Sequence, residues 1–95
     1  MPVAVIMDFE DTSLEQYDEV IGKMGFSHGG PGAKGGLFHW VTQTNGGIRV
    51  TDVWESKEEF ERYSESTIAP LTAEAGIQGP PKVTYAEVYN YLTAG

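Results

Sequence analysis

The chain has 95 residues, which suffices for one domain with its own core but not for two, so a single domain over residues 1–95 is expected. Its composition, 40% hydrophobic and 12% aromatic, is that of a globular rather than a disordered protein. The formal net charge of −8 argues against binding to nucleic acid or to an anionic membrane, and the lack of cysteine excludes disulfides, a thiolate nucleophile and a cysteine-ligated zinc site.

No apolar run approaches the roughly 18 residues that suggest a transmembrane helix, and no basic stretch precedes an apolar segment as in a signal peptide. The expected location is therefore cytoplasmic.

The first elements read as a strand and a helix. Residues 2–9 (PVAVIMDF) form a short apolar run that is typical of a buried strand. Ser13, with Gln16 three residues later, has the spacing of a capping box and predicts a helix start. Gly25 is placed to end this helix. The face that the helix is expected to bury carries Leu14, Tyr17, Ile21 and Met24.

Residues 27–36 (SHGGPGAKGG) contain five glycines and a proline, so no regular element is expected there. A phosphate-binding role is disfavoured because the stretch lacks the ending of a P-loop and does not lead into a helix. The favoured interpretation is a mobile connector or a lid over a pocket.

Residues 37–55 predict a β-hairpin around Asn45-Gly46. Either a two-residue turn or a four-residue loop over 44–47 pairs Gln43 with Ile48, so that His39 lies opposite Asp52 and Leu37 opposite Trp54. One face then carries Leu37, His39, Val41, Val50, Asp52 and Trp54.

The second half repeats the pattern of helix and strand. Ser56 with Glu59 predicts another capping box, in which the Glu59 side chain reaches back to the helix start. Pro70 is expected to end that helix, and a short segment over 70–75 follows. Residues 82–92 (KVTYAEVYNYL) are expected to form a long last strand.

The element order strand, helix, strand, strand, helix, strand predicts an α+β, ferredoxin-like βαββαβ fold. A four-stranded antiparallel sheet carries both helices on one face. The first and third strands are expected in the centre, parallel to each other.

The other sheet face would be left open and rich in aromatic side chains. Such a patch exceeds what a monomer usually exposes, so a homodimer through this face is expected. Its predicted members are Phe38, Trp40, Val53, Tyr85, Tyr89 and Tyr91.

The element order, the chain length and the segment 53–60 (VWESKEEF) resemble the dimeric α/β barrel superfamily, and its antibiotic biosynthesis monooxygenase-like branch in particular. The resemblance implies a pocket between sheet and helices, on the face that carries Trp54. It allows cofactor-independent monooxygenases, haem-degrading enzymes, polyketide cyclases and lactone isomerases. Many members carry a histidine nine residues after this tryptophan, where this chain has Tyr63. This departure argues against a haem-ligating role for that position.

Among the residues expected to face the helices, His39, Asp52 and Asn90 are polar and are candidates for a site. Asp52 would hold the His39 imidazole in one tautomer and raise its basicity, as a general base for a phenol or an enolisable carbon requires. The expected ligand is a small aromatic compound. No cofactor is expected for the reaction. The remaining candidates are Trp54 and Phe60 as walls, Asn90 as a binding residue and Tyr63 as a hydroxyl donor.

Two alternatives remain open. A His–Asp cross-strand pair can serve only to fix the hairpin register, in which case the protein is a non-catalytic ligand binder or a structural homodimer.

A metal site is not expected, because His39 and Asp52 supply two ligands and a catalytic zinc generally has three from the protein.

Overall fold

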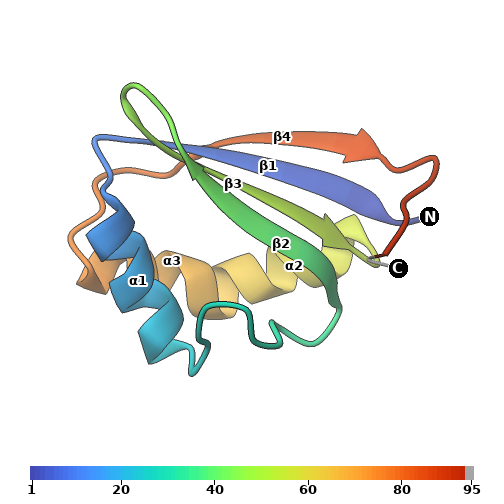
Figure 1. The fold of residues 1–95 in the computed structure, drawn as a ribbon, viewed down its shortest axis with the longest axis horizontal. Helices are drawn as coiled ribbons and strands as arrows, with labels where there is room; N and C mark the ends of the chain where they lie inside the picture. The colour runs from blue at the N-terminus through green and yellow to red at the C-terminus, as the bar shows by residue number, and fades with distance from the viewer. Residues whose placement is uncertain (94–95) are drawn as a thin grey trace.

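The computed structural model describes residues 1–93, which form an α+β domain with a four-stranded antiparallel sheet and all helices on one of its faces (Figure 1). This arrangement is compatible with a ferredoxin-like fold. Its elements are β1 (Val3–Glu10), α1 (Leu14–Lys23), β2 (Gly36–Gln43), β3 (Gly47–Trp54), α2 (Lys57–Tyr63), the π-helix η1 (Ser64–Ile68), α3 (Ala69–Glu74) and β4 (Lys82–Glu87).

The strand order is β2-β3-β1-β4, and every neighbouring pair is antiparallel. The central strands β1 and β3 are therefore antiparallel, and the prediction that they run parallel is wrong. The crossover through α1 brings β2 back parallel to β1, and β3 lies between these two strands and opposes both.

The core lies between the sheet and the helices. β1 alternates as expected of a half-buried strand, with Val5, Met7 and Phe9 buried on the helix side. On α1 the predicted inner residue Leu14 is 38% exposed, whereas Val20 is buried. Buried side chains from β3 and α2 complete the core cluster, namely Ile48, Val50, Trp54 and Phe60.

The predicted helix starts are correct, but the second one lacks half of its cap. At α1 both hydrogen bonds of the capping box between Ser13 and Gln16 are present. At α2 the Ser56 hydroxyl accepts from the Glu59 amide at 3.1 Å. The Glu59 side chain does not reach back, and its Oε2 is buried without a hydrogen-bond partner. Gly25, with φ of 85°, lies just after α1, and Phe26 N donates to Ile21 O at 2.9 Å.

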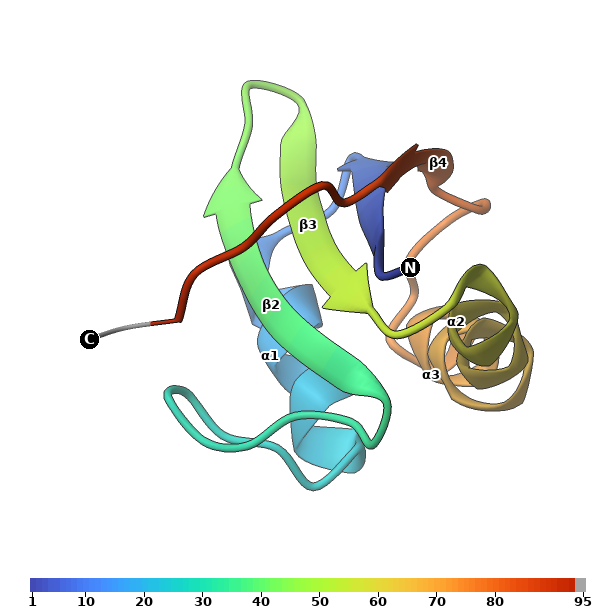
Figure 2. The ribbon, with the colours of Figure 1, turned by 90° about the vertical axis from the view of Figure 1, so that its right-hand side faces the viewer.

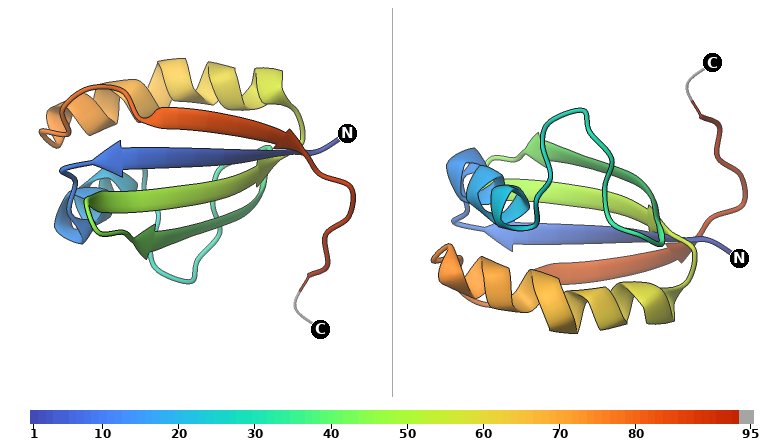
Figure 3. Two further views of the ribbon diagram at one scale, coloured as in Figure 1. Left: turned by 90° about the horizontal axis from the view of Figure 1, so that it is seen from above. Right: turned by 90° about the horizontal axis from the view of Figure 1, so that it is seen from below.

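The prediction that Pro70 ends the second helix is wrong. α2, η1 and α3 follow one another without a break and form one rod along the sheet (Figure 3). The π-turn provides the reason, because the Ala69 amide donates to the carbonyl of Ser64, five residues back. Pro70 then occupies the first turn of α3, where a missing N–H and a fixed φ are tolerated.

The last strand is shorter than predicted, and Tyr85, which was expected on its open face, points toward the helices. It ends at Glu87 rather than at residue 92. Tyr85 pairs with the fully buried Val5, and its ring lies edge-on to Phe60 on the helix side, with 6.1 Å between ring centroids. Tyr85 therefore does not belong to the open face. Both alternating sets of this segment contain apolar residues, so the period of two could not indicate which set is buried.

The segment after β4 crosses the end of the sheet (Figure 2). Tyr91 packs edge-on against Phe38, with 5.4 Å between ring centroids, whereas Tyr89 is 98% exposed. Of the other predicted open-face residues, Trp40 is 51% exposed and Val53 is buried. The chain thus covers part of its own open face.

The two glycines of the hairpin turn differ sharply in their surroundings. A Cβ at Gly47 would overlap the carbonyl oxygen of Phe9 on β1, whereas a Cβ at Gly46 would meet no heavy atom within 4 Å. We expect Gly47→Ala to lower the free energy of unfolding by about 1–3 kcal/mol and Gly46→Ala to change it by less than about 0.5 kcal/mol. Urea denaturation of both variants measures the difference, and equal stabilities would contradict this packing.

Candidate functional site

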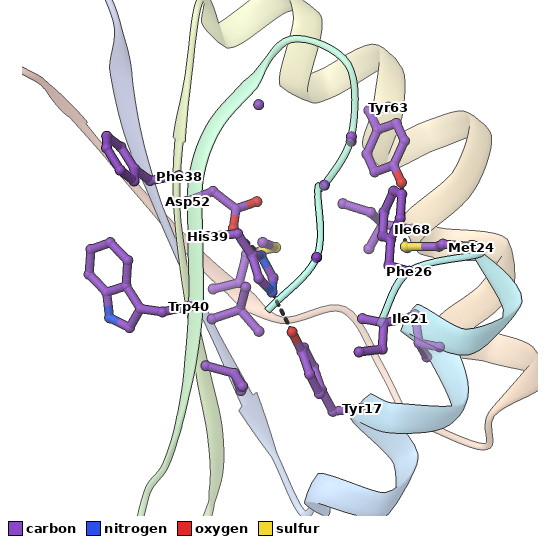
Figure 4. Close-up of a pocket in the computed structure, with 18 of the residues that line it drawn as sticks. Tyr17, Ile21, Met24, Phe26, Phe38, His39, Trp40, Asp52, Tyr63 and Ile68 are labelled. Atoms are coloured by element: carbon purple, nitrogen blue, oxygen red, sulfur yellow. Dashed lines mark hydrogen bonds and ion pairs between the residues drawn. The ribbon is translucent and has the colours of Figure 1, made fainter. Parts of the chain in front are cut away.

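A cavity of about 570 Å³ lies between the sheet and the helices. It is bordered by β1, β2 and β3, by α1, by the helical rod and by residues 26–33 of the loop before β2 (Figure 4). Most side chains around it are apolar, and among them are Met7, Ile21, Met24, Phe26, Val41, Ile48, Val50 and Ile68. A lining of this kind is typical of a pocket for a mainly apolar small molecule.

His39 and Asp52 form a hydrogen-bonded pair in this cavity, as the hairpin parity predicts. They are register partners on β2 and β3, and His39 Nδ1 lies 2.6 Å from Asp52 Oδ1. The Trp54 indole donates to the other carboxylate oxygen at 2.9 Å. The Asp52 side chain is only 7% exposed, and both of its oxygens have partners, so its burial is compensated.

Tyr17 adds a third member that the sequence reasoning missed. Its hydroxyl lies 2.5 Å from His39 Nε2, and the two rings stack with 5.8 Å between centroids (Figure 4). A carboxylate can only accept, so Nδ1 of the neutral imidazole carries the proton and Nε2 accepts from Tyr17. One feature of the sequence could have indicated Tyr17, namely that it is a tyrosine on an otherwise apolar helix face. A partly buried hydroxyl needs a hydrogen-bond partner, and such a face offers none.

The register prediction fails at the base of the hairpin. Trp54 pairs with Gly36 instead of Leu37, since a bulge separates Gly36 from Phe38. The loop therefore lies directly against the indole ring, and a Cβ at Gly35 would come within 3.3 Å of it. Gly35 also has a φ of 91°, which favours glycine.

Tyr63 borders the cavity but is not bonded to the His39–Asp52 pair. Its hydroxyl donates to Met24 Sδ at 3.3 Å, and its ring lies 5.3 Å from that of Trp54. Burial, and after it the charge of Asp52, raises the pKa of Tyr63. The residue is thus available as a neutral wall or donor.

Two predicted binding residues lie away from the cavity lining. Phe60 is 2% exposed and does not line the cavity. It packs edge-on against Trp54, with 5.8 Å between the ring centroids. Asn90 is exposed in the segment beyond β4, because the strand that was expected to position it ends at Glu87.

The glycine-rich loop has no regular structure before β2 begins at Gly36, and residues 27–33 line the cavity. One end is held to α1, where His28 Nε2 lies 2.7 Å from Asp18 Oδ1. The other end is held to the residue that follows β3, where the Glu55 amide donates to Gly35 O at 3.1 Å. This placement agrees with a connector that covers a pocket.

The hydroxyl of Tyr17 is a weak acid in this environment. Burial, followed by the charges of Asp52 and Asp18, raises its pKa from 10.0 to about 12. The folded state therefore holds this proton more tightly than the unfolded state, and the stability it contributes is complete below pH 10 and declines as the pH rises toward 12.

We expect the wild type to lose more stability between these pH values than Tyr17→Phe, which has no proton to release there. Denaturant unfolding at several alkaline pH values measures the difference, and the ultraviolet absorbance of tyrosinate follows the titration itself. A stability loss that is the same in both proteins would contradict the assignment.

Within residues 1–93, no group of three or more His, Asp and Glu side chains is placed to hold a metal ion. In the same part of the chain no helix is long and apolar enough to cross a membrane. Comparison of the chain with protein-family models, with curated proteins and with solved structures yields no match.

Proposed function

We propose that this protein is a small-molecule enzyme of the dimeric α/β barrel type, in the manner of the antibiotic biosynthesis monooxygenase-like branch. It removes a proton from a flat phenolic or polyketide-like compound without a bound cofactor. Cyclisation, isomerisation or, with molecular oxygen as the oxidant, oxygenation can each follow from that step. The observation that carries the proposal is the hydrogen-bonded chain of Tyr17, His39 and Asp52 beside an apolar cavity.

His39 is the general base in this proposal. Its Nδ1–H donates to Asp52, which fixes the tautomer and leaves the Nε2 lone pair as the site that takes up a proton. When the proton arrives, the imidazolium forms next to a buried carboxylate, and the opposite charges stabilise each other. Asp52 acts through His39 and is a positioning residue.

Tyr17 stabilises the charge that develops on the substrate. Its hydroxyl is hydrogen-bonded to His39 Nε2, so a substrate must displace it from this nitrogen. In moving aside, the hydroxyl can donate to the substrate oxygen that becomes an enolate or phenolate, which replaces the hydrogen bond it gives up. With a pKa raised to about 12, Tyr17 remains a donor at neutral pH. Trp54 and Tyr63 form the aromatic walls.

A proton-exchange assay tests the proposed function before the natural substrate is known. β-Tetralone is flat and bicyclic, and its enolisable protons exchange for deuterium in heavy water when a base removes them. We expect the protein to accelerate this exchange and Tyr17→Phe to slow it by about tenfold or more, as followed by proton NMR. Exchange at the buffer rate with a panel of such ketones and phenols would contradict a general-base function.

The competing function is ligand binding without catalysis. It is favoured by one observation, namely that both ring nitrogens of His39 already have protein partners, as in a structural network. In that case a ligand binds in the cavity while no exchange occurs in the assay above. A purely structural role would show neither binding nor exchange.

The homodimer belongs to the same proposal. The open face still exposes half of the Trp40 side chain, next to Phe38 and Tyr91, and a second copy would bury this apolar surface. We expect sedimentation velocity to show a dimer for the wild type and a monomer for Trp40→Lys. Ser66→Lys, which is exposed on the helical rod and away from the open face, serves as the control for the added charge. A monomeric wild type at micromolar concentration would overturn this part of the proposal.

A further inference from the structure

We infer that the ligand of this cavity is uncharged: it is a neutral phenol or ketone, not a carboxylate, phosphate or amine. The inference deepens the proposed function, because it takes the cavity to be a ligand site. It rests on the placement of every charged side chain around the cavity.

Within the described residues, the cavity is lined by no Lys or Arg. The basic side chains are engaged elsewhere. Lys23 pairs with Glu19 and Glu74, Arg49 pairs with Asp8 on the open face, and Lys57 lies over the ring of Tyr85. Lys34 and Arg62 border a separate surface hollow together with Glu55, Glu59 and Glu65, and Lys82 pairs with Asp8 in the β1–β4 register.

The two histidines of the cavity do not supply a free positive charge. His39 is bonded to Asp52, and His28 is bonded to Asp18, so a proton gained by either ring is matched by an adjacent carboxylate. An anionic ligand would therefore enter a mainly apolar space that, among the described residues, already holds one carboxylate and no Lys or Arg to compensate it. Burying a second negative charge there is strongly unfavourable.

A cationic ligand is excluded for a different reason. Among residues 1–93, Asp52 is the only carboxylate in the lining, and its two oxygens accept hydrogen bonds from His39 Nδ1 and Trp54 Nε1. An ammonium group would lose its water without gaining a carboxylate partner. A neutral hydroxyl or carbonyl avoids this loss, because Tyr17 and His39 can exchange hydrogen bonds with it.

The raised pKa values of two tyrosines agree with the presence of a negative charge and no compensating cation in the cavity. Burial, and after it the charge of Asp52, raises the pKa of both Tyr17 and Tyr63 on the cavity wall. A negative group in the cavity is thus disfavoured at two separate positions. A forming enolate avoids this cost, because its proton moves to His39 and the net charge of the cavity does not change.

Three probes with one ring system test the inference: neutral α-naphthol, the anion α-naphthoate and the cation α-naphthylmethylammonium. Binding is measured by calorimetry and by the indole N–H signal of Trp54. The Trp40→Phe variant leaves Trp54 as the only tryptophan of the chain, so its signal is unambiguous. We expect α-naphthol to bind at least about tenfold more tightly than either ion.

An ion that binds as tightly as α-naphthol overturns the inference, and so does binding that leaves the Trp54 signal unchanged. Asp52→Asn tests whether the charge of Asp52 disfavours the anion. Removing this charge should reduce the difference in affinity between α-naphthol and α-naphthoate, and an unchanged difference also counts against the inference. Failure of all three probes to bind overturns it together with the proposed function. Selective α-naphthol binding without exchange of β-tetralone supports the inference and overturns only the catalytic proposal.

Discussion

Replacement of His39 by alanine is expected to lower the rate of proton exchange by about 10²–10⁴-fold, which is the usual contribution of a general base. The variant removes the imidazole nitrogen that takes the proton in the proposed mechanism, while Tyr17 and the aromatic walls remain. The exchange rate of β-tetralone in heavy water measures the loss, and kcat/KM measures it once a substrate is known.

Two further variants separate catalysis from folding. His39→Asn keeps a donor near the position of Nδ1 for Asp52 but has no basic nitrogen, so it should be folded and equally slow. Glu15→Gln changes an exposed side chain at the start of α1 that does not line the cavity, and it should retain the wild-type rate within about twofold. Full activity of His39→Asn would show that another group is the base.

The largest effect on stability is expected for Trp54→Ala. Trp54 is 3% exposed, lies against Phe60 and Tyr63 and donates to Asp52. Its removal leaves a cavity and also an unpaired carboxylate oxygen, so the free energy of unfolding should fall by about 3–5 kcal/mol. Thermal and urea unfolding of the purified variant measure this loss.

The chain contains a matched control for this variant. Trp40 has the same side chain but is 51% exposed on the open face, so Trp40→Ala should lower the stability of the monomer by less than about 1 kcal/mol. Trp54→Phe keeps an aromatic ring but loses the indole donor and should lie between the two. Similar losses for both alanine variants would contradict the assigned packing of Trp54.

The sequence determined those features that depend on residues close together in the chain. The Asn45-Gly46 turn sets the parity of the hairpin, because residues that flank a two-residue turn must pair, and this parity alone predicts that His39 and Asp52 face each other. Likewise, Ser13 and Ser56 cap helices through amides three residues away. Such interactions need no information about the rest of the fold.

The tertiary structure decided what depends on contacts between distant segments. Tyr17 reaches His39 only because α1 packs across β2, and Tyr85 faces the helices because β4 pairs with β1 in a register that its own pattern does not specify. The bulge at Leu37 and the π-turn before Pro70 likewise are irregularities that no local period indicates. Side-chain alternation and capping are local properties of the backbone, whereas a partner across the core is selected by packing, which involves the whole chain at once.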